Sequence, residues 1–442
     1  MIDDRSVLIL YSTAVCNLKC TYCFIDKNPA LIQIDKLLAE SFKDDYYFNF
    51  CKKVFPDPSQ LEEIQIWGGE PTLDFHRITP VIKKIVEYYP NLHTLMFSTN
   101  LAHDECLSEI YYLLHNIPKE REITLNLQLS LDGPTFITDA NRGKGTTEKF
   151  TKNFIKLIST IDNFLDDHPN IVINAFNKST LNIDNILSLQ TEQAIIDYYK
   201  FIEKFKGLCN KILIKNSRFN FEPSIPNTAA PLPITVEVGK KFANLCALCR
   251  KIEKDNQDNQ IFDYFSVITP YATDRDSDKC FCNKGACGSG KYCIGLLPNN
   301  LISTCHNGFT ALLEEYKKYA LLNNTTNLQE NFFESGFARN SMVFDYAELS
   351  NYENQIEEFY KENSANQISA LVGQIQFLAI TKQIDSKYTT LKNAIDAAYF
   401  ISTHGVNCIR DNINITGTKL LVPANLLKLT LNGAKEYIEN DR

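Results

Sequence analysis

Short apolar segments alternate with helical patterns through the first half of the chain. Residues 6–11, 63–67, 94–98, 123–131, 171–176 and 211–222 predict strands. Helical patterns lie between them, near residues 34–54, 75–89, 104–116, 146–167 and 184–205. In the fourth, apolar side chains recur at intervals of three and four, at Phe150, Phe154, Leu157, Ile158, Ile161 and Leu165. This order predicts an α/β fold with βαβ units and a parallel sheet. Right-handed crossovers would curl such a sheet into an open or closed barrel, with ligands at the carboxyl ends of its strands.

The pattern changes after the sixth predicted strand. Four prolines (Pro223, Pro226, Pro231 and Pro233) occur within eleven residues, which neither a helix nor a central strand accommodates. A helical pattern near 235–254, a polar segment and a cysteine-rich segment follow, and the chain beyond about residue 310 is mostly helical in pattern. We therefore expect three regions, at residues 1–234, 235–310 and 311–442.

Composition and charge exclude several classes of protein. The 442 residues carry 45 Lys and Arg against 53 Asp and Glu, a net charge of −8. This balance argues against nucleic-acid binding through a large basic patch. No apolar run approaches the roughly 18 residues of a membrane span. The first residues lack a basic region followed by an apolar stretch, so we expect a cytoplasmic protein.

The 14 cysteines are unevenly distributed. In a reducing compartment they are not expected to form a disulfide framework, and clusters of cysteines then indicate metal binding. Cys16, Cys20 and Cys23 form a C-x3-C-x2-C run directly after the first predicted strand. Three such thiolates can each bind one iron of a four-iron cluster and leave the fourth iron open to a small molecule. A zinc site with a distant fourth ligand is the alternative reading of this run alone.

Three further motifs follow the next three predicted strands, in the order Gly68-Gly69-Glu70-Pro71, Ser98-Thr99-Asn100 and Ser130-Leu131-Asp132-Gly133-Pro134. Asp139 and Arg142 come a few residues later. Together with the cysteine run, this series resembles the radical S-adenosylmethionine (SAM) superfamily over about residues 6–222. The resemblance is to its peptide- and protein-modifying branch, such as RiPP (ribosomally made peptide) maturases and anaerobic sulfatase-maturating enzymes. It implies a partial (β/α)6 TIM-type barrel over residues 1–234.

The resemblance also implies a role for each motif. Cys16, Cys20 and Cys23 would hold a 4Fe-4S cluster that binds SAM. The glycines of the motif Gly68, Gly69 and Glu70 would permit close backbone approach, and the motif's exposed carbonyl and carboxylate would hold the SAM ammonium. The remaining cofactor-binding residues would be Tyr22 beside the adenine, Ser98 and Asn100 near the ribose and carboxylate, and Ser130 with Arg142 on the carboxylate.

A second cysteine cluster comprises Cys280, Cys282, Cys287, Cys293 and Cys305. It is similar to the start of the SPASM or shorter twitch auxiliary-cluster domains that follow many peptide-modifying radical SAM barrels. Asn300 stands where glycine is usual, and asparagine tolerates the left-handed conformation of a tight hairpin turn. We expect one auxiliary 4Fe-4S cluster in residues 235–310, held by Cys287, Cys293 and Cys305. Its fourth ligand would be Cys280, Cys282, Cys408 or a substrate atom, and zinc is the alternative metal.

Two further motifs carry no site. The segment from Gly285 to Lys291 approaches a phosphate-binding loop, but Tyr292 follows it instead of the Ser or Thr that would bind magnesium. Cys246 and Cys249 lie in an apolar helical pattern and are expected to be buried thiols.

The function implied by the resemblance is reductive cleavage of SAM to a 5′-deoxyadenosyl radical that abstracts hydrogen from a peptide or protein. A cross-link, an oxidised residue or an epimer in a precursor peptide would result, with flavodoxin or ferredoxin as electron donor. The alternatives are a twitch-type dehydrogenase of a small alcohol or aminoglycoside, an anaerobic sulfatase maturase, or a non-enzymatic protein whose clusters only stabilise the fold. No catalytic acid or base on the substrate side is indicated.

Overall fold

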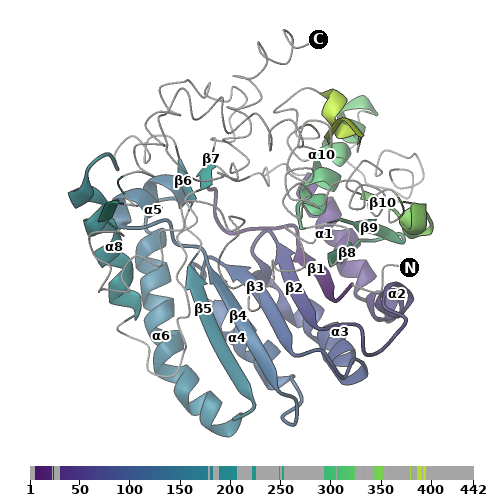
Figure 1. Ribbon diagram of the computed structural model, residues 1–442, viewed down its shortest axis with the longest axis horizontal. Coiled ribbons are helices and arrows are strands. Elements are labelled where there is room, and N and C mark those ends of the chain that lie inside the picture. The colour runs from purple at the N-terminus through teal and green to yellow at the C-terminus, as the bar shows by residue number, and fades with distance from the viewer. Residues whose placement is uncertain are drawn as a thin grey trace.

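The computed structural model describes residues 5–21, 23, 30–177, 180–182, 189–206, 222–224, 248, 251–252, 293–304, 306–323, 332, 343–351, 354, 379, 386–390 and 392–394. These residues form a mixed α/β fold built on one large sheet (Figure 1).

The strands of this sheet lie in the order β10-β9-β8-β1-β2-β3-β4-β5. Each neighbouring pair from β8 to β5 is parallel, whereas the pairs β8–β9 and β9–β10 are antiparallel. The bounds are β1 Val7–Thr13, β2 Glu63–Gly68, β3 Thr94–Thr99, β4 Ile123–Leu129, β5 Ile171–Asn177, β8 Cys293–Leu296, β9 Leu301–Ser303 and β10 Val343–Asp345. A separate parallel pair consists of β6 Thr180–Asn182 and β7 Glu222–Ser224.

Helices connect the parallel strands, and α3, α4 and α6 lie along one face of the sheet (Figure 1). The bounds are α1 Ala30–Ser41, α2 Tyr46–Val54, α3 Phe75–Tyr88, α4 Cys106–His115, α5 Thr135–Arg142, α6 Thr146–Asp167, α8 Glu192–Lys206 and α10 Asn307–Leu322. Short 3-10 turns occupy Pro71–Leu73, Tyr346–Glu348 and Ser386–Thr389. No helix among the described residues combines the length and the apolar composition that crossing a membrane requires.

The first five predicted strands are confirmed, each to within two residues of its observed ends. The sixth, at 211–222, lies outside the described residues except for Glu222, which begins β7.

The prediction of one helix over 34–54 is wrong, because the chain forms α1 and α2 there. Asp44 and Asp45 between them have φ of 52° and 59°, a left-handed conformation that no helix can continue through.

The hairpin expected near Asn300 is confirmed, and it extends the main sheet. Asn299 and Asn300 have φ of 58° and 56° between β8 and β9, as the two central residues of a type I′ turn require. The backbone N–H of Asn300 donates to the Tyr46 hydroxyl at 2.6 Å, which attaches the turn to α2. Since β8 pairs with β1 and β9 pairs with β10, strands from all three predicted regions share one sheet. The region beyond residue 310, expected to be helical, therefore contains a strand as well as α10.

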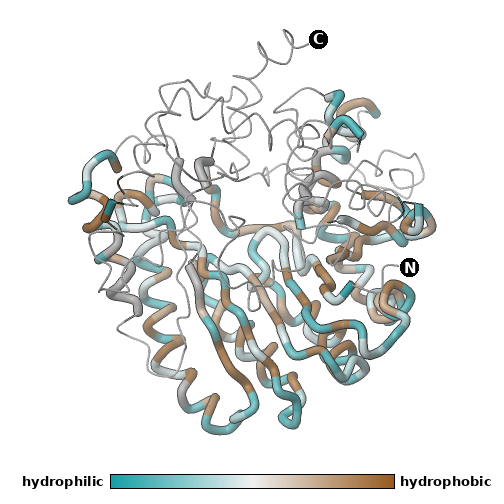
Figure 2. Tube along the Cα trace, viewed as in Figure 1, coloured by the Kyte–Doolittle hydropathy of each residue, from teal (hydrophilic) through white to brown (hydrophobic). Residues whose placement is uncertain are grey.

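The sheet has an apolar face and a mixed face. Alternate residues of β1–β5, such as Leu8, Ile64 and Phe97, are buried against α2–α6. Apolar and polar positions likewise alternate along α6 (Figure 2). On the other face of the sheet, Val7, Ile9 and Tyr11 of β1 are buried with residues of α10. Burial on both faces makes β1 the apolar centre of the fold.

The mixed face becomes polar across β2–β5. The strand register aligns Gln65, Met96, Asn126 and Asn174 in one row, and all four are half-buried. Within this face the Asn174 amide donates to Asn126 Oδ1 at 3.1 Å. In the next row Gln128 Nε2 donates to Ser98 Oγ at 3.2 Å. Half-buried amides on a sheet face favour contact with a polar ligand.

Glu63 is a buried carboxyl at the start of β2, on this same face. Burial raises its pKa to about 7, with a smaller contribution from Glu62, although a hydrogen bond from Gln65 Nε2 at 2.8 Å opposes the shift. The folded chain therefore keeps this proton over a pH range in which the unfolded chain has released it.

We expect the free energy of unfolding to fall as the pH rises from about 4.5 through about 7, because the raised pKa makes ionised Glu63 a cost of folding. Glu63→Gln should be more stable than the wild type at pH 8 by up to about 3 kcal/mol. Urea unfolding at pH 5.5 and pH 8 measures this difference. Glu87→Gln, at an exposed position of α3, is the matched control, and an equal dependence on pH in both variants would contradict the assignment.

Candidate functional site

The loop that carries Cys16, Cys20 and Cys23 begins where β1 ends, at the carboxyl edge of the parallel strands. All three cysteines are half-buried. The loop makes a tight turn in which the Cys23 N–H donates to the Cys20 carbonyl at 3.1 Å, and the Leu18 N–H donates to Cys16 Sγ at 3.4 Å. Donation of a backbone N–H to sulfur is typical of loops that present thiolates.

An ion pair that the sequence analysis missed fixes the start of this loop. Asp35 of α1 accepts from the Ala14 N–H at 2.9 Å and from the Thr13 hydroxyl at 2.5 Å. Arg77 of α3 binds both oxygens of Asp35, at 3.1 and 3.2 Å, and also donates to the Ser12 carbonyl at 3.3 Å. Two helices thus hold the end of β1, and no local motif marks either charged residue.

Gly68 and Gly69 allow the loop after β2 to pass directly beside the cysteine loop. The Gly69 N–H donates to the Thr13 carbonyl and the Glu70 N–H to the Val15 carbonyl, both at 2.9 Å. A Cβ atom on Gly69 would lie 2.2 Å from the Val15 carbonyl oxygen, and one on Gly68 2.4 Å from that of Thr13. The predicted close backbone approach is present, and it is made to the chain segment that precedes Cys16.

The expectation of an exposed Glu70 carboxylate is wrong. Glu70 is 2% exposed, and its Oε1 accepts from the Thr72 N–H at 3.2 Å and from the Thr72 hydroxyl at 2.6 Å. Its Oε2 accepts from the Asn100 N–H at 2.7 Å. A buried carboxylate requires such donors, and the neighbouring loops supply them. Glu70 therefore joins the ends of β2 and β3.

Asn100 lies beside the first cysteine. Its side-chain amide donates to Asn17 Oδ1 at 2.9 Å and lies 4.0 Å from Cys16 Sγ. Asn17 in turn donates to the Ala102 carbonyl at 3.1 Å. Leu101 has a φ of 47°, which is strained for an apolar side chain, and Asn153 of α6 donates to its carbonyl at 2.8 Å. The loop after β3 is thus held in an unusual conformation against the cysteine loop.

Ser98 lies near the end of β3, and Ser130 directly follows β4. Their hydroxyl oxygens lie 3.3 Å apart, and both side chains are half-buried. Hydrogen bonds thus join Gly69, Glu70 and Asn100 to the end of β1 and the cysteine loop, whereas Ser98 and Ser130 contact each other at the ends of the neighbouring strands.

Arg142, predicted to bind the SAM carboxylate, forms a bidentate ion pair with Asp132. Its Nε and Nη2 bind the two carboxylate oxygens of Asp132, at 2.9 and 2.8 Å. Arg142 is 7% exposed and Asp132 is 0% exposed, so the pair is buried. The remaining nitrogen, Nη1, lies 4.0 Å from Cys20 Sγ. Arg142 thus contacts the cysteine loop itself.

The electrostatics of the loop suit a cationic group. Burial is the largest cause that raises the pKa of the Cys16 thiol to about 12, and the nearby Glu70 carboxylate and the thiols of Cys23 and Cys20 add to this shift. The hydrogen bond from the Leu18 N–H acts in the opposite direction. Such thiols ionise when a bound metal centre supplies positive charge. Within the described part of the chain, no three His, Cys, Asp or Glu side chains converge on a single metal ion. The donor set of three thiols from one loop fits a multi-iron cluster, in which each thiolate binds its own iron.

The second cysteine cluster is mostly outside the described residues, which exclude Cys280, Cys282, Cys287, Cys305 and Cys408, as well as Tyr22. Cys293 is buried at the start of β8 and pairs with Val7, at the end of β1 opposite the cysteine loop. Its sulfur lies 3.5 Å from the Thr304 carbonyl oxygen. His306 stacks on Trp67 with ring centroids 4.3 Å apart, which brings the segment after β9 beside the strand that ends in Gly68.

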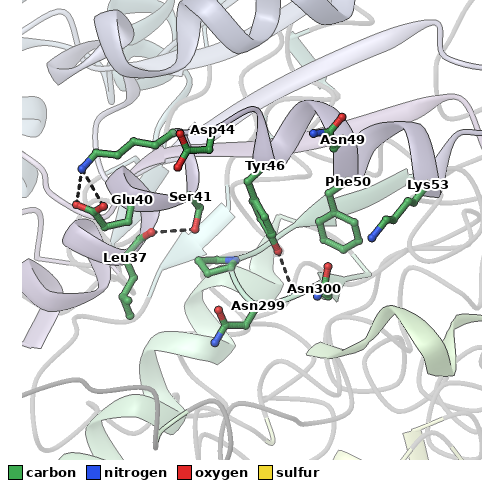
Figure 3. Close-up of a pocket in the computed structure, with 12 residues that line it drawn as sticks. Leu37, Glu40, Ser41, Asp44, Tyr46, Asn49, Phe50, Lys53, Asn299 and Asn300 are labelled. Carbon is green, nitrogen blue, oxygen red and sulfur yellow. Dashed lines mark hydrogen bonds and ion pairs between the residues drawn. The ribbon is translucent and has the colours of Figure 1, made fainter.

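A pocket of about 510 Å³ lies away from these residues, between the α1–α2 connection and the β8–β9 turn (Figure 3). Its lining includes a Lys43–Glu40 ion pair at 2.8 Å and the Tyr46 hydroxyl at the turn. None of the predicted site residues lines it.

The amino-terminal region matches a known protein family. A family model described as "4Fe-4S single cluster domain" matches residues 6–153, about a third of the chain. This range contains the three cysteines and every motif described above for β1–β4. The match confirms the predicted resemblance of this region to iron–sulfur proteins.

Individual similar proteins are more distant. An uncharacterized protein of Methanocaldococcus jannaschii, MJ0907, is 26% identical over 136 residues, which are 30% of this chain and 41% of that protein. Three crystal structures of Streptococcus suis SuiB are 14–15% identical: SuiB by itself, bound to S-adenosylmethionine, and bound to its precursor peptide SuiA. They cover 69–70% of this chain and 59–61% of SuiB, with TM-scores of 0.38, 0.36 and 0.34.

We expect Gly69→Ala to displace the cysteine loop, because the added Cβ would overlap the Val15 carbonyl group. Iron bound after anaerobic reconstitution should fall several-fold, as measured by iron and sulfide analysis. Gly145→Ala is the control, since a Cβ there meets nothing within 4 Å although its φ of 83° is also unfavourable for alanine. Full iron uptake by Gly69→Ala would show that the close approach is not needed.

Proposed function

We propose that this chain is a radical SAM enzyme that modifies a peptide or protein substrate. The observation that carries the proposal is the loop with Cys16, Cys20 and Cys23, fixed across the carboxyl ends of β1–β4 within the range that matches a 4Fe-4S domain. The proposed reaction is oxidative maturation of a ribosomally made precursor, as a cross-link, an oxidised residue or an epimer.

Cys16, Cys20 and Cys23 would hold the 4Fe-4S cluster. In the superfamily that the chain resembles, such a cluster supplies the electron that cleaves SAM and yields a 5′-deoxyadenosyl radical for hydrogen abstraction. Asp35, Glu70 and Asn100 hold the loop in place, by the hydrogen bonds described above. The chain's contribution is therefore a prearranged loop whose three thiols keep their positions before the cofactors bind.

The SAM-binding surface would be the edge formed by the Gly68-Gly69 loop, Ser98, Asn100 and Ser130. The hydroxyl groups of Ser98 and Ser130 lie at the polar face, where they can donate to the ribose or carboxylate of SAM. Tyr22 is proposed beside the adenine. Glu70 stabilises this edge through hydrogen bonds, since its carboxylate accepts from Thr72 and Asn100.

The polar face of the sheet is the proposed substrate side. Gln65, Asn126, Gln128 and Asn174 offer uncharged amide groups there, which can both donate to and accept from a peptide backbone. The Asn174 Oδ1 atom is buried without a hydrogen-bond partner among the described residues, as an acceptor awaiting a donor would be. Peptide as the substrate class follows from the resemblance, and these amides are compatible with it.

The remaining parts of the proposal concern the second half of the chain. Residues 235–310 would form a twitch- or SPASM-like domain with one auxiliary 4Fe-4S cluster, held by Cys287, Cys293 and Cys305, and by Cys280, Cys282 or Cys408. This cluster would accept the second electron of the substrate or anchor it. Residues 311–442 would assist peptide recognition, and a flavodoxin or ferredoxin in the cytoplasm would supply electrons.

We expect replacement of Cys16, Cys20 or Cys23 by Ala to abolish reductant-dependent release of 5′-deoxyadenosine, because the iron that binds SAM would be lost. Chromatography of the nucleoside after anaerobic incubation with SAM and dithionite measures this. Cys51→Ala is the matched control: Cys51 is fully buried in α2 against the apolar face, so this change costs stability and leaves cleavage intact. Release of 5′-deoxyadenosine by a Cys20→Ala protein at the wild-type rate would refute the proposed function.

A further inference from the structure

We propose that Arg142 is a positioning residue of the cluster, which holds the Cys20 thiolate and raises the reduction potential of the cluster. This inference rests on the proposed function, because it assumes the cluster on Cys16, Cys20 and Cys23. It assigns Arg142 to the cysteine loop, whereas the resemblance implied a contact with the SAM carboxylate.

The geometry of Arg142 is set by Asp132. The guanidinium edge formed by Nε and Nη2 binds the two Asp132 oxygens at 2.9 and 2.8 Å, a bidentate arrangement that leaves the group one orientation. In that orientation Nη1 lies 4.0 Å from Cys20 Sγ. The ion pair with Asp132 on one edge of the guanidinium therefore fixes the direction of Nη1, the nitrogen that lies near Cys20.

Asp132 is itself fixed. Its carboxylate accepts from the Asn141 amide at 3.2 Å, and its carbonyl oxygen accepts from the Tyr198 hydroxyl at 2.5 Å. The Tyr198 ring lies so close to Gly133 that a Cβ there would be 2.2 Å from it. Asp132, completely buried, is thus held by α5 through its carboxylate and by α8 through its carbonyl oxygen.

The last turn of α5 contacts the cysteine loop at a second point. The Thr21 N–H donates to the Asn141 carbonyl at 2.8 Å, next to the contact between Arg142 and Cys20. Adjacent residues of the helix thus hold adjacent residues of the loop, one through the backbone and one through the side chain. The backbone hydrogen bond between Thr21 and Asn141 therefore also fixes the position of Arg142 relative to Cys20.

A buried guanidinium beside a cluster ligand has a predictable electrostatic effect. Reduction adds one negative charge to the cluster, and a nearby cation stabilises the more negative state in a medium of low dielectric constant. Asp132 offsets part of this effect, since it lies on the far side of the guanidinium. The positive charge faces Cys20, so the net effect favours reduction.

The experiment compares the reduction midpoint of the reconstituted protein without SAM, by an EPR-monitored redox titration, in the wild type, Arg142→Gln and Arg142→Lys. We expect Arg142→Gln to shift the reduction equilibrium about tenfold toward the oxidised cluster, which is 59 mV more negative for a one-electron couple. Arg142→Lys keeps the charge without the fork and should fall between the two. Arg121→Gln is the control, because Arg121 donates to the carbonyls of Val86, Tyr89, Pro90 and Leu92 near the amino ends of β3 and β4, at the sheet edge opposite the cysteine loop.

Each outcome decides the inference. A negative shift in Arg142→Gln that Arg142→Lys partly restores supports it, as does loss of iron from a folded Arg142→Gln protein that Arg142→Lys retains. A wild-type midpoint in Arg142→Gln, together with weakened SAM binding by calorimetry, overturns it and returns Arg142 to the SAM carboxylate. A wild-type protein that assembles no iron–sulfur cluster overturns the proposed function as well.

Discussion

The candidate site depends on one buried carboxylate. Glu70 receives hydrogen bonds from Thr72 and Asn100, while its own N–H binds the Val15 carbonyl, so a single residue joins the ends of β1, β2 and β3. A buried charge of this kind is stable only while every donor stays in place, which makes the three strand ends mutually dependent. The two glycines before Glu70 are needed because the backbones must approach more closely than a Cβ permits. The cysteine loop has its position because this junction exists.

The same junction gives the loop its electrostatic character. Glu70 lies near Cys16, and Asp132 lies behind Arg142 near Cys20, so the first two cysteines of the run each have a carboxylate in their surroundings. At Cys20 the Arg142 guanidinium lies between the carboxylate and the sulfur. The three thiols are therefore not equivalent. Burial and the Glu70 carboxylate raise the pKa of the Cys16 thiol, whereas the Cys20 sulfur lies 4.0 Å from the Arg142 guanidinium.

The local features of the fold could be predicted from the sequence, and its long-range contacts could not. Apolar alternation predicts the first five strands, and the cysteine spacing with the three strand-end motifs predicts which residues surround the loop. The break at Asp44 and Asp45 depends on two residues in a left-handed conformation, which the helical pattern of 34–54 hides. The contacts of Asp35 with Arg77 and of Asn153 with Leu101 join segments dozens of residues apart and have no motif. The partner of Arg142 could not be predicted either, because a guanidinium fits the carboxylate of Asp132 as well as that of a ligand.

The position of β1 between β8 and β2 has a kinetic consequence. Its backbone groups are paired on both sides and its side chains are buried on both faces, so its amides exchange with solvent only when a large part of the sheet separates. The cysteine loop begins at the end of this protected strand, and hydrogen bonds to the loops after β2 and β3 hold it there. The base of the loop therefore keeps its place through local openings of the sheet, and assembly of the centre does not require the chain to refold.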